Sequence, residues 1–259
     1  MAASLTNQCV LITGASSGIG TSCARMFAQA GARLILAARR KEKLQTLADE
    51  LQQRYQTPTL LLCVDVQDRQ AVIAAIEGLP ADWQTVDVLI NNAGLSRGLE
   101  KQHESSIPDW EEMIDTNVKG LLYMTRTVVP GMVARGQGHV VNIGSIAARQ
   151  TYTGGSVYCA TKAAVKALSE GLKIDLLGTP VRVTNIEPGL VETEFSNVRF
   201  RGNDDKAKSV YTGMTPLTPD DIADTILFAV TRPAHVNISE IFVMPTDQSS
   251  VTHVHRNLA

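Results

Sequence analysis

Short apolar runs alternate with longer amphipathic segments along nearly the whole chain, and this pattern constrains the fold more than any other feature. The apolar runs predict strands over residues 9–12, 33–38, 59–64, 86–90, 139–143, 181–186 and 238–243. The segments between them predict helices over residues 21–30, 41–55, 68–77, 107–133, 156–177 and 219–230. Continuous apolar strands separated by helices are typical of a parallel sheet that is buried on both faces. We predict an α/β fold, with a doubly wound parallel sheet of about seven strands and helices on both faces.

Length, charge and composition bear on the number of domains, the partners and the location of the protein. The 259 residues contain no linker, so we expect a single domain over residues 1–259. The net charge of −2 favours neither nucleic acid nor an anionic membrane surface. No apolar run is long enough to span a bilayer, and the first residues lack the pattern of a secretory signal. Four scattered cysteines and no clustered histidines predict free thiols, no metal site and a cytoplasmic location.

One segment interrupts the alternation of strands and helices. Residues 194–216 are polar and include Arg199, Arg201, Lys206 and Lys208. A long insertion of this kind is often a functional lid. We predict a substrate lid near residues 191–216, and a solvated surface loop is the alternative.

A glycine-rich loop follows the first predicted strand. Residues 13–20 read TGASSGIG and open the first helix. Glycines let the backbone approach a phosphate closely, and the helix N-terminus supplies free N–H groups and partial positive charge. The loop therefore predicts a dinucleotide site, although a plain helix-capping turn uses the same residues.

The end of the second predicted strand bears on which dinucleotide binds. Enzymes that use NAD place a carboxylate there, whereas arginine accommodates the 2′-phosphate of NADP. This chain has Arg39 and Arg40, and its next carboxylate is Glu42. The two guanidiniums favour NADP, and their alternative role is as surface charges at the start of a helix.

Tyr158 and Lys162 are four residues apart in a predicted helix, so they share one face. An ammonium beside a phenol stabilises the phenolate, which lowers the pKa of the tyrosine. Such a pair is a candidate general acid and base. Taken alone, the spacing also fits a solvated helix face.

Together these motifs resemble the short-chain dehydrogenases/reductases over nearly the full length of the chain. The matching residues are TGASSGIG at 13–20, NNAG at 91–94, Asn117, Ser145, Tyr158, Lys162 and the Pro-Gly pair at 188–189. The resemblance implies a Rossmann-like domain in which Tyr158 carries the proton and Lys162 lowers its pKa and holds the nicotinamide ribose. It implies that Ser145 polarises the substrate oxygen and that Asn117, within the long helix, positions a water connecting Lys162 to solvent.

The resemblance also implies a set of residues that bind NADP. Asp65 and Val66 would contact the adenine, and Asn91 would contact its ribose. Pro188, Gly189, Val191 and Thr193 would line the nicotinamide side. The remaining expected contacts come from Gly14, Ser16, Ser17, Gly18, Ile19, Gly20, Arg39, Arg40, Ala93, Gly94, Tyr158 and Lys162.

Residues 188–202 and 231–238 resemble the bacterial and fungal NADP-dependent 3-hydroxy acid dehydrogenases, which implies a substrate of the serine, allo-threonine or 3-hydroxypropionate/malonic semialdehyde class. Such an acid needs a cation for its carboxylate, and we nominate Arg149 and Arg199 beside Ser145 and Tyr158. The alternatives are a reductase of 3-oxoacyl carrier protein, sugar alcohols or xenobiotic carbonyls, and an NADP-sensing regulator without catalysis. The family also implies a homotetramer built on its long helices.

Overall fold

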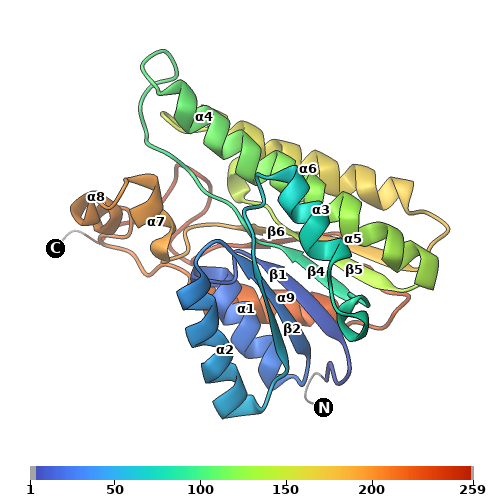
Figure 1. Ribbon diagram of the computed structural model, residues 1–259. Helices are drawn as coiled ribbons and strands as arrows, with labels where there is room; N and C mark the ends of the chain where they lie inside the picture. Colours follow the sequence, from blue (N-terminus) through green and yellow to red (C-terminus); the bar gives the residue numbers. More distant parts are fainter. Residues whose placement is uncertain (1–3, 258–259) are drawn as a thin grey trace.

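The computed structural model describes residues 4–257, and the strands within them form one parallel sheet (Figure 1). The sheet has seven strands in the order β3-β2-β1-β4-β5-β6-β7. Their bounds are β1 Cys9–Thr13, β2 Arg33–Ala38, β3 Thr59–Cys63, β4 Val88–Asn91, β5 Gly138–Ile143, β6 Val181–Pro188 and β7 Glu240–Val243. From β1 the chain continues to β2 and β3 on one side of β1, and it then crosses to β4 on the other side. The strand order therefore reverses between β1 and β4. Ligands of such sheets bind outside the carboxyl ends of the strands at this switch point.

Helices cover both faces of this sheet, as the sequence predicts (Figure 1). Helices α1, α2 and α9 pack on one face, and α3, α5 and α6 pack on the other. The bounds are α1 Gly18–Gln29, α2 Lys41–Tyr55, α3 Arg69–Glu77, α4 Ile107–Ile114, α5 Leu121–Arg135, α6 Ser156–Asp175, α7 Glu194–Arg199, α8 Asp204–Ser209 and α9 Pro219–Val230. The predicted doubly wound α/β fold is confirmed.

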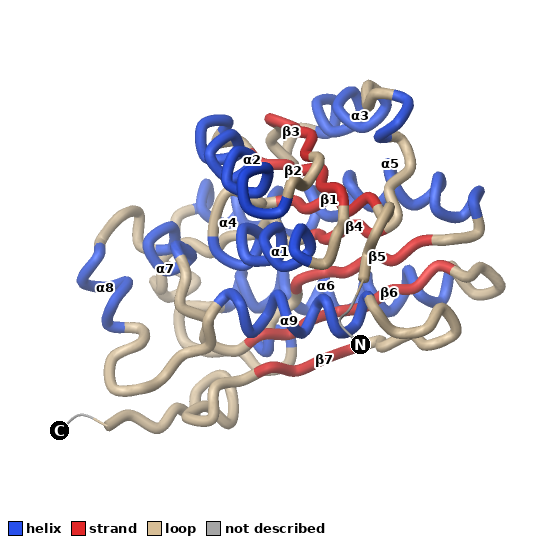
Figure 2. Tube along the Cα trace, turned by 90° about the horizontal axis from the view of Figure 1, so that it is seen from below, coloured by secondary structure: helices blue, strands red, loops and turns tan. Residues whose placement is uncertain are grey.

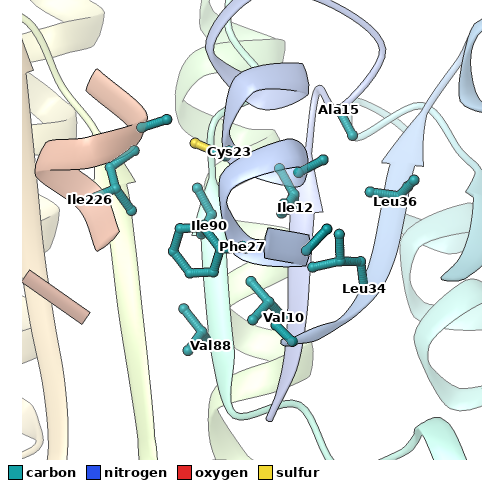
Figure 3. Close-up of a cluster of buried hydrophobic side chains, with 14 of the residues drawn as sticks. Val10, Ile12, Ala15, Cys23, Phe27, Leu34, Leu36, Val88, Ile90 and Ile226 are labelled. Carbon is teal, nitrogen blue, oxygen red and sulfur yellow. The ribbon is translucent and has the colours of Figure 1, made fainter. Parts of the chain in front are cut away.

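Alternating side chains along the central strands build two cores. Val10 and Ile12 of β1 point to the face covered by α1 and α9, where they pack around Phe27 and Ile226 (Figure 3). Leu11 lies between them in sequence and joins the opposite core. Because strand side chains alternate between faces, a strand that is apolar throughout must be covered on both sides.

Residues 107–133, predicted to be mostly helical, are helical throughout, with a change of helix type in the middle. Helix α4 ends at Ile114, a π-helical turn spans Asp115–Gly120, and α5 begins at Leu121. The extra residue in each backbone hydrogen-bonded ring of a π turn rotates the side chains that follow, and such turns are frequent at functional sites. The turn contains Asn117, so it decides where that amide points.

The segment predicted as a lid contains two short helices. Helices α7 and α8 lie beyond one end of the sheet, where the tube view separates them from the packed layers (Figure 2). Residues 191–216 are called the lid segment below. Within residues 4–257, no helix combines the length and the apolar character that crossing a membrane requires.

Candidate active site

A cavity of about 360 Å³ opens at the carboxyl ends of the central strands, between the glycine-rich loop and the lid segment. Nineteen of the predicted site residues line it: Gly14, Ser16, Ser17, Gly18, Ile19, Arg39, Arg40, Asp65, Val66, Ala93, Gly94, Ser145, Tyr158, Lys162, Pro188, Gly189, Val191, Thr193 and Arg199. Four predicted residues lie outside the lining: Gly20, Asn91, Asn117 and Arg149.

The glycine-rich loop is shaped by close backbone approaches. Gly14 has a φ of +66°, and a Cβ there would lie 3.0 Å from the Cα of Ala93. A Cβ on Gly20 would lie 2.4 Å from the carbonyl oxygen of Gly14, so only glycine fits. Gly20 therefore supports the loop from behind without lining the cavity. The backbone itself forms the cavity wall at the start of α1, which is the form a phosphate-binding loop takes.

Asn91, which is predicted to contact the ribose of the adenosine, does not line the cavity. Its side chain is buried and donates hydrogen bonds to Thr125 Oγ1 (3.1 Å) and Asn142 Oδ1 (2.9 Å). The next residue, Asn92, lines the cavity and donates to the carbonyl oxygen of Thr13 at 2.9 Å. The sequence of the NNAG motif does not distinguish its two asparagines, and the alternation of side chains at the end of β4 turns Asn92, not Asn91, towards the cavity.

Both arginines after β2 lie at the rim of the cavity. Arg40 donates to Ser16 Oγ at 3.0 Å and pairs with Glu194 at 2.9 Å. Arg39 lies 3.6 Å from a carboxylate oxygen of Asp65. The cationic end of the cavity is therefore formed jointly by the ends of β2 and β3 and by the glycine-rich loop.

Helix α6 presents Tyr158 and Lys162 to the cavity, next to Ser145. The Lys162 ammonium lies 5.8 Å from the centre of the Tyr158 ring and donates to the carbonyl oxygen of Ile143 at 2.8 Å. Ser145 begins a 3₁₀ turn at the end of β5 and accepts a hydrogen bond from the backbone N–H of Ala147. The i,i+4 spacing on α6 thus brings the phenol and the ammonium to one place.

Burial acts on both groups. It lowers the pKa of Lys162 to about 8. It also raises the pKa of Tyr158 above its ordinary value, more strongly than the charge of Arg199 and the Ser145 hydroxyl lower it. The direction for Tyr158 is opposite to the one expected from its lysine neighbour, because a neutral phenol needs less solvation than a phenolate. A phenolate here requires further positive charge in the cavity.

Asn117 joins three parts of the site through its side chain. Its Oδ1 accepts from the backbone N–H of Leu95, and its Nδ2 donates to the Leu95 carbonyl oxygen, both at 2.8 Å. The same Nδ2 donates to Thr161 Oγ1 on α6 at 3.0 Å. The amide therefore joins the segment that follows β4 to the π-helical turn and to α6. Its predicted part in positioning a water remains a prediction.

Arg199 reaches the cavity from the end of α7. Its guanidinium carbon lies 5.5 Å from the Tyr158 ring centre and 5.2 Å from that of Phe195, and its Nη2 donates to the Tyr152 hydroxyl at 3.1 Å. The Nε of Arg199 is buried and has no hydrogen-bond partner among residues 4–257. A buried donor that lacks a partner is costly, so this guanidinium is suited to an anionic ligand.

Arg149, the other nominated arginine, points away from the cavity. Its Nε donates to Glu187 at 2.7 Å, its Nη2 pairs with Glu240, and its guanidinium stacks 4.0 Å from the centre of the Phe242 ring. The 3₁₀ turn after Ser145 carries Arg149 to side chains of β6 and β7. Nearness in sequence to Ser145 was therefore a poor guide to its direction.

The lid segment contributes residues that the motifs did not identify. Glu194, Phe195 and Tyr211 line the cavity, and the Phe195 ring packs edge-on against Tyr158 at 5.7 Å between centres. Their signal in the sequence is their position in a polar insertion, and Glu194 and Phe195 also lie within the segment 188–202 that resembles the 3-hydroxy acid dehydrogenases. No group of three or more candidate metal ligands occurs within residues 4–257.

The lid segment is held down from two directions. Its Arg199 carbonyl oxygen accepts from the Gly98 N–H at 3.0 Å, and Arg201 pairs with Asp109 of α4. From the other side, Arg256 donates to the Val210 carbonyl oxygen at 2.9 Å. The C-terminal segment, residues 248–257, therefore packs back onto the lid of its own chain.

Comparison with known proteins agrees with this geometry. Residues 8–204 match the short chain dehydrogenase family, and the chain belongs to that family. It is 52% identical over 250 residues to an NADP-dependent 3-hydroxy acid dehydrogenase of Salmonella typhi, covering 96% of this chain and 99% of the relative. An NADP-dependent 3-hydroxy acid dehydrogenase of Schizosaccharomyces pombe is 46% identical over 256 residues, covering 98% and 99% of the two chains.

Solved structures give the same picture. The closed form of a serine dehydrogenase complexed with NADP⁺ matches with a TM-score of 0.90 and 50% identity, over 96% of this chain and all of the other. A serine dehydrogenase from Escherichia coli matches with a TM-score of 0.81 and 45% identity, over 93% of this chain.

Proposed function

We propose that the protein is an NADP-dependent oxidoreductase that transfers hydride between NADP(H) and the hydroxyl or carbonyl carbon of a small 3-hydroxy acid. The substrate class is that of serine, allo-threonine and 3-hydroxypropionate or malonic semialdehyde. The relatives named above support this class, since they match over nearly the whole chain. The observation that carries the proposal is Arg199, a cation with an unpartnered buried donor, beside Tyr158 in one cavity.

The residues present fit a dinucleotide phosphate. A cradle of glycine backbone and the rim arginines lie at one end of the cavity, and the ends of β5 and β6 lie at the other. Gly14, Gly18 and Arg40 would hold the phosphates, and Pro188 and Thr193 would line the nicotinamide side. When bound, the cofactor supplies the ring that accepts or donates the hydride, and its oxidised form adds a positive charge.

The chain's own groups handle the proton and the substrate oxygen. Tyr158 Oη takes the hydroxyl proton in oxidation and returns it in reduction. Lys162 supplies positive charge that favours the phenolate against the effect of burial, and a bound oxidised nicotinamide would add to it. Ser145 Oγ donates to the substrate oxygen, and Arg199 binds the carboxylate through paired hydrogen bonds.

The test compares a carboxylate substrate with a neutral alcohol of similar size. Arg199→Met should raise KM for 3-hydroxypropionate by about 10- to 100-fold, because a charge-assisted hydrogen-bonded pair is lost, and should change KM for butan-2-ol little. Lys208→Met is the matched control, since Lys208 is an exposed cation of the same lid segment and lies outside the cavity lining. Equal increases for both substrates would remove Arg199 from carboxylate binding.

We further propose a single domain that assembles as a homotetramer in the cytoplasm. Ile114 and Leu122 on α4 and α5 are 41% and 39% exposed, and Ile174 on α6 is 66% exposed, which supports a helix-mediated contact between subunits. The free state of all four cysteines supports a reducing compartment. Light scattering of the purified protein tests the assembly.

A further inference from the structure

The first residue of α7 joins the lid segment to the cofactor end of the cavity. One carboxylate oxygen of Glu194 lies 2.9 Å from Arg40 Nη1, and the other lies 2.8 Å from Lys43 Nζ. Arg40 directly precedes α2, and Lys43 is in its first turn. A single carboxylate therefore holds two cations at the edge of the dinucleotide cavity, which Glu194 itself lines.

Arg40 and Lys43 form a site for an anion, and in this structure the Glu194 carboxylate occupies it. The Arg40 guanidinium also donates to Ser16 Oγ at 3.0 Å, so it is fixed against the glycine-rich loop. The side chains of Arg40, Lys43 and Glu194 are 42%, 47% and 46% exposed, so the ion pairs are screened by solvent and are exchangeable. Hydrogen bonds from Lys43 and Arg40 lower the pKa of Glu194, which keeps the carboxylate ionised at neutral pH.

We propose that Glu194 is an internal competitor of the cofactor's 2′-phosphate, and that Lys43 is a further residue of the 2′-phosphate site. This inference rests on the NADP dependence proposed above. NADP and the α7 contact then compete for the same two cations, so cofactor binding releases the start of α7 from α2. NAD lacks the phosphate and leaves the contact in place.

The balance of charge favours the phosphate. A phosphate monoester carries a charge of about −1.5 to −2 near neutrality, whereas the carboxylate carries one negative charge. Arginine also binds phosphate through two parallel hydrogen bonds. Glu194 therefore reduces affinity for NADP without blocking it. Two exposed ion pairs of this kind correspond to about a two- to fivefold effect on binding.

Binding measurements on the full chain test the competition directly. Glu194→Gln should lower Kd for NADP and for the probe 2′-AMP by about two- to fivefold, and should leave Kd for NAD unchanged. The gain should shrink at high salt, because exposed ion pairs are screened. Glu192→Gln is the matched control: it removes the same charge from the same segment, and Glu192 is exposed and makes no ion pair in the part of the chain that the structure describes. It should alter no Kd.

Lys43→Gln gives the complementary measurement. It should raise Kd for NADP and 2′-AMP by about two- to fivefold and leave Kd for NAD unchanged. Weaker NADP binding by Glu194→Gln, or equal changes for NADP and NAD, would overturn the competition. If the wild-type protein binds NAD as tightly as NADP, the proposed function fails instead, so the two failures are distinguishable.

Discussion

At the scale of single residues, Tyr158 and Lys162 have the spacing that chemistry requires, but their protonation is set by burial. Burial lowers the pKa of Lys162 to about 8 and raises the pKa of Tyr158. Both shifts favour the neutral forms of the two groups. The proposed proton transfer from the substrate to Tyr158 therefore depends on how much positive charge the cavity provides when the cofactor is bound.

Replacing Tyr158 by Phe should reduce kcat by at least about 100-fold, because the proton carrier is lost while the ring that packs on Phe195 remains. NADPH binding, followed by fluorescence titration, should persist. The matched control is Tyr152→Phe, which removes a neighbouring hydroxyl that binds Arg199 and should act mainly on KM. Substantial turnover by the Tyr158 variant would contradict the proton-carrier role.

Replacing Lys162 by Met should change how stability depends on pH. The pKa of Lys162 is about 8 in the folded protein and 10.5 ordinarily, so between these values the unfolded chain binds more protons. The free energy of unfolding contributed by Lys162 therefore rises with pH across this window. Urea denaturation at intervals from about pH 7 to pH 10 should show wild type gaining stability relative to Lys162→Met. Parallel profiles would mean that the ammonium is not strained by burial.

At the scale of elements, the glycine-rich loop and the π-helical turn are the local structures on which the site depends. The loop packs against the NNAG segment, where Asn92 donates to the Thr13 carbonyl oxygen. The turn directs Asn117 towards Leu95 and Thr161. The loop joins the end of β1 to the segment after β4, and the π-helical turn joins that segment to α6. A local change in either structure is therefore transmitted to the cavity.

Replacing Gly20 by Ala should raise Kd for NADP at least about tenfold and destabilise the fold by about 1–3 kcal/mol through overpacking. The reason is that the new Cβ would lie 2.4 Å from the Gly14 carbonyl oxygen and 2.7 Å from Asn92 Nδ2. Gly171→Ala on α6 is the control, since no other part of the described chain lies within 4 Å of its Cβ position. It should be neutral or stabilising by up to about 1 kcal/mol. Thermal denaturation and NADP titration measure both effects.

At the scale of the whole molecule, the lid segment is held in place by contacts with distant parts of the chain. Glu194 contacts α2, Arg201 pairs with α4, and Arg256 binds carbonyl oxygens of Val210 and Thr212. The lid is therefore coupled to the cofactor end, to the helices beside the substrate end and to the C-terminal segment.

Replacing Arg256 by Ala should loosen the lid and raise KM for the hydroxy acid several-fold, with little effect on Kd for NADP. The lost hydrogen bonds to the Val210 and Thr212 carbonyl oxygens are the physical reason. Faster amide hydrogen exchange over residues 204–216 should accompany the change. Arg232→Ala is the control, because Arg232 donates to the Phe228 carbonyl oxygen at the end of α9. Unchanged exchange in the lid would remove the C-terminal segment from this role.

The sequence by itself determined the layered fold, the glycine-rich loop and the Tyr158–Lys162 pair of this protein. Apolar periodicity decides these because a strand that is apolar on both faces has to be covered on both sides. The glycine spacing and the i,i+4 pair on α6 involve residues close together in sequence, so both motifs can be recognised without knowledge of tertiary contacts. The strand ends also placed Ser145, Arg39 and Arg40 at one edge of the sheet.

Only the tertiary structure decided the directions of side chains after turns and across the lid. Strand alternation turned Asn92 towards the cavity and Asn91 into the core, and the 3₁₀ turn after Ser145 carried Arg149 to Glu187. Arg199 and Glu194 reach opposite ends of the cavity from the same short helix, α7. These outcomes depend on contacts between residues far apart in sequence, and no local spacing encodes them.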